Sequence, residues 1–129
     1  RLDLDALFRA AGANTRAMFI NSPANPTGWT ATRDELQAIL AFARTKGIWI
    51  IADEIYEKIV YDGRSMTNLA TMTGRDVLCL TYSGLSKAYR VCGFRAGWLA
   101  ITGPLERASS FIEGSKLLAN MRMCANVPA

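Results

Sequence analysis

The chain has 129 residues, half of them hydrophobic and a fifth charged, with a formal net charge of +4 and no histidine. This length predicts one domain, the apolar share excludes intrinsic disorder, and the scattered basic residues and short apolar runs predict neither a nucleic-acid partner nor a membrane-spanning helix. Without an imidazole, these residues cannot form a Ser-His-Asp or Cys-His site or a histidine-ligated metal site, so acid and base chemistry falls to Lys, Tyr, Asp, Glu or Cys.

The first quarter of the chain is predicted to form a helix, a strand and a stiff loop. Leucines and a phenylalanine within residues 2–8 indicate a short amphipathic helix, and the apolar residues 17–20 are a strand-sized run. Two prolines within residues 21–28 forbid both helix and central strand there. We therefore expect a shaped loop after the first strand.

A helix and a second strand follow. Thr32 and Glu35 have the spacing of a capping box, apolar residues then recur at helical spacing, and Gly47 supplies a helix end. Residues 48–52 are apolar at every position, which favours a parallel strand covered on both faces over an alternating, half-exposed one.

The second half of the chain completes an α/β pattern. Residues 77–82 and 97–101 are two further strand-sized runs, and Pro104 suits the first turn of a final helix that extends to about Met123. The connection over residues 87–97 is too short for a helical crossover, so the fourth strand should run antiparallel to the third. We expect three parallel strands plus one antiparallel strand, with flanking helices.

Five polar side chains should meet at one edge of this sheet. Ligands bind beyond the carboxyl ends of parallel strands, because the loops converge there. The loops after the first three strands carry, in order, Asn25, then Asp53 with Tyr56, then Lys87. If the fourth strand is antiparallel, it starts at that same edge and brings Arg95 with it.

This set of side chains suits pyridoxal 5'-phosphate. A lysine amine forms a Schiff base with the aldehyde of this cofactor, a carboxylate keeps its ring nitrogen protonated, and an arginine pairs with its phosphate. A phenol and an amide can both hydrogen-bond the phenolic oxygen of the ring. The sequence therefore predicts a pyridoxal phosphate site and no metal site.

Three successive motifs resemble those of one family. Their residue types, order and spacing are similar to those of the class I/II aminotransferases. The motifs are Asn-Pro-Thr-Gly at 25–28, Ala-Asp-Glu-Ile-Tyr at 52–56, and Ser-Lys at 86–87 followed by Gly-Phe-Arg-Ala-Gly at 93–97. These are fold-type I pyridoxal phosphate enzymes. Residues 83–98 and the tail from residue 112 are most similar to the bacterial alanine (glutamate–pyruvate) aminotransferase group.

The resemblance implies roles for the five side chains. Lys87 would be the Schiff-base lysine and the base that moves the substrate Cα proton. Asp53 would pair with the pyridine nitrogen. Tyr56 and Asn25 would bind the phenolic oxygen, and Arg95 would bind the phosphate. In this reading Lys87, Asp53 and Tyr56 are the catalytic residues.

The resemblance also implies a larger enzyme. Residues 1–129 would be a fragment from the middle of the large, cofactor-binding domain of an aminotransferase. In full-length form that enzyme would move an amino group between an amino acid, alanine or glutamate, and a 2-oxo acid. Relatives are homodimers with residues of both subunits at each site. The odd number and wide spacing of the three cysteines indicate buried thiols in a reducing compartment, which predicts a cytoplasmic protein.

Other readings stay open at this stage. Many relatives carry Ser or Thr three residues before the lysine, where this chain has Gly84, so Ser83 and Ser86 are candidates for a substitute phosphate ligand. Residues 84–88 partly resemble the Gly-x-Ser-x-Gly turn of a hydrolase, although the last residue is alanine and a histidine is missing. Lys87 could be a solvated lysine, or the chain a catalytically inactive structural fragment. A lyase or decarboxylase of the same fold is a further alternative.

Overall fold

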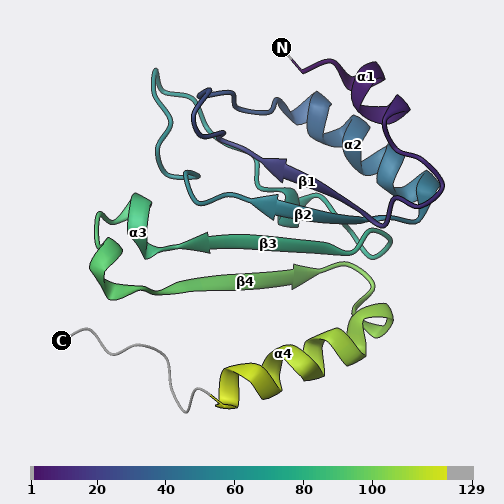
Figure 1. Cartoon of the computed structure of the whole chain (residues 1–129). Coiled ribbons are helices and arrows are strands. Elements are labelled where there is room, and N and C mark those ends of the chain that lie inside the picture. The colour runs from purple at the N-terminus through teal and green to yellow at the C-terminus, as the bar shows by residue number, and fades with distance from the viewer. Residues whose placement is uncertain (1, 122–129) are drawn as a thin grey trace.

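The structure is a computed structural model that describes residues 2–121. Within that range a single sheet has the order β1-β2-β3-β4, with the first three strands parallel and β4 antiparallel to β3 (Figure 1). The predicted sheet is thereby confirmed. The strands are β1 (Ala17–Asn21), β2 (Trp49–Asp53), β3 (Cys79–Gly84) and β4 (Gly97–Thr102). The helices are α1 (Leu4–Arg9), α2 (Arg33–Lys46), α3 (Leu85–Ala88) and α4 (Ser109–Met121).

Helix α2 begins and ends as the sequence predicts. The hydroxyl of Thr32 accepts a hydrogen bond from the Glu35 N–H at 3.2 Å, and the Glu35 carboxylate accepts one from the Thr32 N–H at 2.8 Å. At the other end Gly47 adopts a left-handed conformation with φ 64°, which a residue with a Cβ disfavours. These two caps fix the length of the helix that covers the sheet.

One face of the sheet, called the closed face, packs against α2. Ile39 of α2 and Ile50 of β2 are fully buried in this core. Phe8 of α1 stacks on Phe42 of α2 with ring centroids 4.3 Å apart, which fixes α1 over the outer side of α2. The core consists of Met18, Ile20, Ala31, Leu36, Ile39, Leu40, Ala43, Ile48, Ile50, Ala52, Leu69, Val77 and Cys79.

The opposite face, called the open face, carries Phe19, Ile51, Asp53 and Tyr82, which the strand register places side by side. Helix α4 reaches this face at the amino end of β2, where Phe111 packs edge-on against Trp49 at 6.0 Å. Towards the carboxyl ends, Phe19 is 63% exposed and Tyr82 is 42% exposed. On β2 itself Ile50 and Ala52 are buried and Ile51 and Asp53 are half-buried, so within the described residues the prediction that β2 is covered on both faces is met only in part.

The final helix also differs from the prediction at its start. Pro104 precedes a 3-10 turn (Leu105–Ala108), and α4 begins only at Ser109. The predicted end near Met123, as well as Cys124, lies outside the described residues. Two more 3-10 turns occupy Leu69–Thr71 and Cys92–Phe94. None of the helices described between residues 2 and 121 is long and apolar enough to cross a membrane.

Candidate active site

The five predicted side chains lie on segments that meet at the carboxyl edge of the parallel strands. Asn25 is in the loop after β1, Asp53 is the last residue of β2, and Tyr56 is in the turn that follows. Lys87 is in α3, directly after β3, and Arg95 precedes β4 (Figure 1). The strand register aligns Asn21 with Asp53 and Asp53 with Tyr82, and Gly84 with Gly97, so all four segments leave the sheet at one edge.

The loop that carries Asn25 is held by hydrogen bonds rather than by regular structure. The Asn25 N–H donates to the Asn21 side-chain oxygen at 2.9 Å, and the buried Ser22 hydroxyl accepts from the Ala31 N–H at 2.9 Å. Pro23 and Pro26 both follow cis peptide bonds. The expected shaped loop is present, and these hydrogen bonds define its path past the end of β2.

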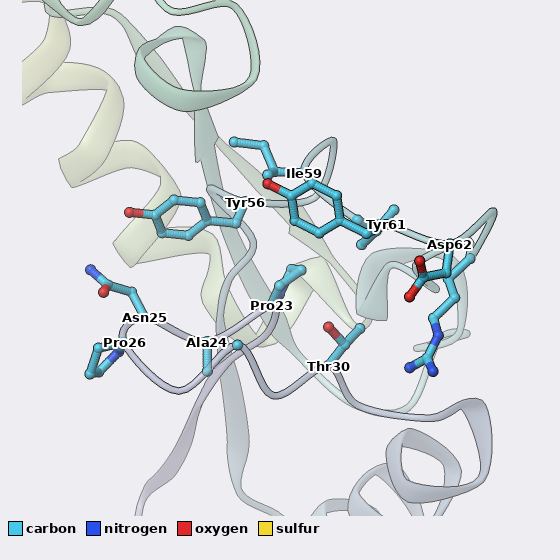
Figure 2. Close-up of a pocket in the computed structure, with 12 residues that line it drawn as sticks. Pro23, Ala24, Asn25, Pro26, Thr30, Tyr56, Ile59, Tyr61 and Asp62 are labelled. Carbon is cyan, nitrogen blue, oxygen red and sulfur yellow. The ribbon is translucent and has the colours of Figure 1, made fainter.

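An amide and a phenol line one cavity of about 410 Å³, and an amine lies beside the phenol. Asn25 and Tyr56 both line it, and Figure 2 shows the Asn25 amide and the Tyr56 hydroxyl pointing to the same side of the pocket. The Lys87 Nζ lies 5.7 Å from the centroid of the Tyr56 ring, which is within the range of a cation–π contact. Three segments that are distant in sequence thus supply three different functional groups to one place.

Asp53 faces a neighbouring hollow on the open face. This second cavity, of about 420 Å³, is lined by Asp53 together with Phe19, Ile55, Tyr82 and Ser83. The carboxylate Oδ1 accepts a hydrogen bond from the Ile55 N–H at 3.2 Å. Asp53 and Tyr56 therefore line two different hollows, and Asp53 shares its hollow with Phe19 and Tyr82 of the open face.

Arg95 lies at the same edge but is exposed and bonded within its own turn. Its Nη1 donates to the Cys92 carbonyl at 2.8 Å, and its backbone is left-handed with φ 49°. The structure thus brings Arg95 to the predicted edge, with the guanidinium held against the turn that leads into β4. Its assignment to a phosphate remains a prediction.

Two glycines let β3 and β4 approach closely beside Lys87. A Cβ added at Gly84 would lie 3.0 Å from the Ala96 carbonyl oxygen, and one added at Gly97 would lie 2.9 Å from the Ser83 carbonyl oxygen. Both distances are shorter than ordinary van der Waals contact. The glycine found three residues before Lys87, where many relatives have Ser or Thr, therefore has a local packing reason in this chain.

A network of polar side chains near Tyr56 was missed by the sequence reasoning. Glu54 is 2% exposed, and its carboxylate accepts from the Leu69 N–H at 2.8 Å and from the Asn68 amide at 2.7 Å. The Asn68 amide also donates to Glu57 at 2.8 Å, and the Ser83 hydroxyl donates to Glu57 at 3.3 Å. The spacing of two glutamates on either side of the Ile-Tyr pair was the available signal.

Burial has two consequences in this network. It raises the pKa of the Glu54 carboxyl, while the hydrogen bonds from Leu69 and Asn68 act in the opposite direction. It also holds the Ser83 hydroxyl against Glu57, while Ser83 still lines the hollow of Asp53, so its role as a substitute phosphate ligand stays a prediction. Ser86, which is half-buried in α3, remains as the other substitute.

Comparisons with known proteins agree on one family. The sequence matches the family described as aminotransferase class I and II over residues 1–125. It is 56% identical over 115 residues to an alanine aminotransferase of Mycobacterium tuberculosis, covering 89% of this chain and 27% of that protein. It is 45% identical over 127 residues to the glutamate-pyruvate aminotransferase AlaA of Escherichia coli, covering 98% of this chain and 31% of that protein.

Solved structures show the same similarity. An aminotransferase from Escherichia coli matches with a TM-score of 0.91 and 44% identity, over 98% of this chain and 31% of that chain. An alanine aminotransferase from Pyrococcus furiosus matches with a TM-score of 0.86 and 32% identity, over 96% of this chain and 31% of that chain. The chain thus spans about 30% of the length of these relatives.

Proposed function

Because this chain belongs to the class I and II aminotransferases, we propose that residues 1–129 form part of the cofactor-binding large domain of such an enzyme. The whole protein would move an amino group between an amino acid, alanine or glutamate, and a 2-oxo acid. Its similarity to relatives named alanine and glutamate-pyruvate aminotransferase supports this choice of substrates. The proposal includes a cytoplasmic homodimer, as the resemblance implies.

Class I and II aminotransferases generally depend on pyridoxal phosphate, and the donor set of this chain fits that group. The cofactor needs a primary amine, donors for its phenolic oxygen and an anion for its ring nitrogen. Lys87, Tyr56 and Asn25 supply the first two: Tyr56 and Asn25 line one cavity, and the Lys87 amine lies beside the Tyr56 ring. Asp53 supplies the third in a second hollow. Arg95 supplies a cation for the phosphate at the same edge.

The residues of the chain would divide the chemistry among them. When bound, the cofactor supplies an electron-withdrawing ring that stabilises negative charge at the substrate Cα. The Lys87 Nζ would hold the cofactor covalently and, once released by the substrate amine, take the proton from the substrate Cα. The Asp53 carboxylate would keep the ring nitrogen protonated, and the Tyr56 hydroxyl and Asn25 amide would donate to the ring oxygen.

One observation carries the proposal. The Lys87 amine lies 5.7 Å from the Tyr56 ring centroid, and Tyr56 shares its cavity with Asn25. Lys87 is exposed within the described residues, but its amine lies against a phenol that shares a cavity with an amide from a third segment. A general base must also lie within reach of the atom that it deprotonates, and α3 holds this amine at the edge where the loops converge.

The test is covalent labelling of the longer protein that carries this chain. We expect pyridoxal phosphate followed by borohydride reduction to label Lys87, and peptide mass spectrometry to locate that label. Lys87→Ala should abolish it, whereas Lys58→Ala, a matched change at an exposed lysine two residues after Tyr56, should leave it intact. Label on another lysine, or on none, would contradict the proposal and favour the hydrolase or the inactive structural fragment.

An assay of the labelled protein separates the reaction types. Transfer of the amino group of glutamate to pyruvate, followed by alanine formation, is expected for an aminotransferase. A protein that is labelled at Lys87 but releases carbon dioxide or ammonia from its substrate would instead be a decarboxylase or a lyase. Either result leaves the assignment of Lys87 in place and changes only the reaction.

A further inference from the structure

Hydrogen bonds connect the turn that carries Tyr56 to the end of β3, beyond the last paired residues of β2 and β3. The β2–β3 pairing ends at Asp53 and Tyr82, followed by one more backbone hydrogen bond from the Glu54 N–H to the Tyr82 carbonyl at 2.9 Å. The next connection is made by side chains, from the Ser83 hydroxyl to the Glu57 carboxylate at 3.3 Å. Glu57 is adjacent to Tyr56 in the chain.

Glu57 uses both of its carboxylate oxygens. Oε1 accepts from Ser83 and Oε2 accepts from the Asn68 amide, and the same amide nitrogen donates its second hydrogen to Glu54. An amide NH₂ group has two hydrogens, so Asn68 is fully used as a donor. The carboxylates of Glu54 and Glu57 are thus both bound to the Asn68 amide.

We propose that Glu57 is a positioning residue that keeps the Tyr56 phenol at its place beside the Lys87 amine. This inference rests on the proposed function, in which both side chains act on one cofactor. Glu57 does not line either of the two cavities next to Tyr56 and Asp53, so it acts through its neighbours. Without its bond to Ser83, the turn after β2 would lose its side-chain connection to the end of β3, and the phenol would move relative to the amine.

The test uses the pH titration of the absorbance of cofactor bound to the longer protein. A phenol that donates to the ring oxygen stabilises the deprotonated form of the Lys87–cofactor link, so Tyr56→Phe should move the titration midpoint to higher pH. We expect Glu57→Ala and Ser83→Ala to move it in the same direction by a smaller amount. Lys58→Ala, an exposed change in the same turn, should leave the midpoint unchanged.

Kinetics supply a second readout. Misplacement of a positioned group lowers the rate of the chemical step, so kcat should fall roughly tenfold in Glu57→Ala with KM changed less than about threefold. Glu57→Gln retains an acceptor for Ser83 but presents an NH₂ group to Asn68, so its kcat should lie between those of the wild type and Glu57→Ala. A purely structural role would not produce this order together with a moved midpoint.

The outcomes separate this inference from the proposed function. If Tyr56→Phe moves the midpoint while Ser83→Ala and Glu57→Ala leave it at the wild-type value, Glu57 has no positioning role. If Glu57→Ala does not fold, Ser83→Ala and Glu57→Gln decide together. Ser83→Ala removes one hydroxyl and keeps the bond between Glu57 and Asn68, but Ser83 also lines the hollow of Asp53. Glu57→Gln, at a residue that lines neither hollow, must therefore move the midpoint in the same direction. If the wild-type protein carries no label on Lys87, the proposed function itself has failed.

Discussion

The two faces of the sheet are built from the same strands but differ in how far their side chains are buried. On the closed face, Ile39 and Ile50 are fully buried under α2, whereas on the open face Phe19 is 63% exposed. Side chains alternate along a strand, so β2 sends Ile50 and Ala52 into the core and Asp53 to the other side. Neighbouring residues of one strand therefore do different things: Ala52 packs in the core that stabilises the fold, and Asp53 faces the candidate site.

The largest expected effect comes from a matched pair of truncations on the two faces. Ile39→Ala should lower the free energy of unfolding by about 2–5 kcal/mol, because it leaves a cavity in a packed core. Phe19→Ala should cost less than about 1 kcal/mol, because this side chain is mostly in solvent already. Urea denaturation of residues 1–129 measures both values, and equal costs would remove the distinction between the faces.

Ile39→Ala and Phe19→Ala can also be compared in the longer protein that carries this chain. If the remainder of the polypeptide covers the open face, Phe19→Ala should cost distinctly more there than in residues 1–129, and Ile39→Ala should cost about the same. A cost of Phe19→Ala that does not change would show that the open face stays uncovered.

An intermediate effect is expected from two carboxyls with opposite pH responses. Burial raises the pKa of Glu54 above its ordinary value of 4.5, so its folded form holds a proton more tightly than the unfolded chain. Its contribution to stability is present at low pH and is lost as the pH rises from 4.5 through the raised pKa. In Glu35 of the capping box, the hydrogen bond from the Thr32 N–H lowers the pKa, so its contribution is lost as the pH falls below 4.5.

Urea midpoints measured between pH 3 and pH 8 distinguish the two carboxyls. Glu54→Gln should flatten the loss of stability on the alkaline side, and Glu35→Gln should flatten the loss on the acid side. Identical profiles in both variants would contradict the assignment of opposite shifts to these two residues.

The smallest effect on stability, yet a clear chemical one, concerns two thiols. Burial on the closed face raises the pKa of Cys79 to about 11, whereas Cys92 is exposed in the turn before β4. A thiol reacts as the thiolate, so a thiol-specific reagent should modify Cys92 in the folded protein and leave Cys79 intact. The number of reactive thiols should fall by one in Cys92→Ser and stay constant in Cys79→Ser. The reverse result would place Cys79 outside the core.

Much of the fold could be read from the sequence because local signals were strong. The capping box at Thr32 and the glycine at position 47 bound α2, and short apolar runs located all four strands found between residues 2 and 121. The length of the connection after Lys87 correctly predicted an antiparallel β4. The convergence of the four segments that carry the five polar side chains followed from the topology alone.

The remainder depended on contacts between distant parts of the chain. Burial of both faces of β2 was inferred from its uniform apolar character, but cover for the open face has to come from elements that the described residues do not supply near Phe19 and Tyr82. The network of Glu54, Glu57 and Asn68 joins residues 11 and 14 positions apart, so the local pair of glutamates around Ile55 and Tyr56 signals only part of it. Sequence reasoning named the side chains with chemistry and missed those that hold them in place.

Gly84 and Gly97 face each other across β3 and β4, so a substitution at one of them affects the other. Engineering a serine at position 84, to imitate the relatives that carry a hydroxyl there, would push a new methylene group towards the Ala96 carbonyl and the Cα of Gly97. The facing strand would have to shift by a few tenths of an ångström to admit it. A substitution at either glycine therefore acts on both strands at once, next to Lys87.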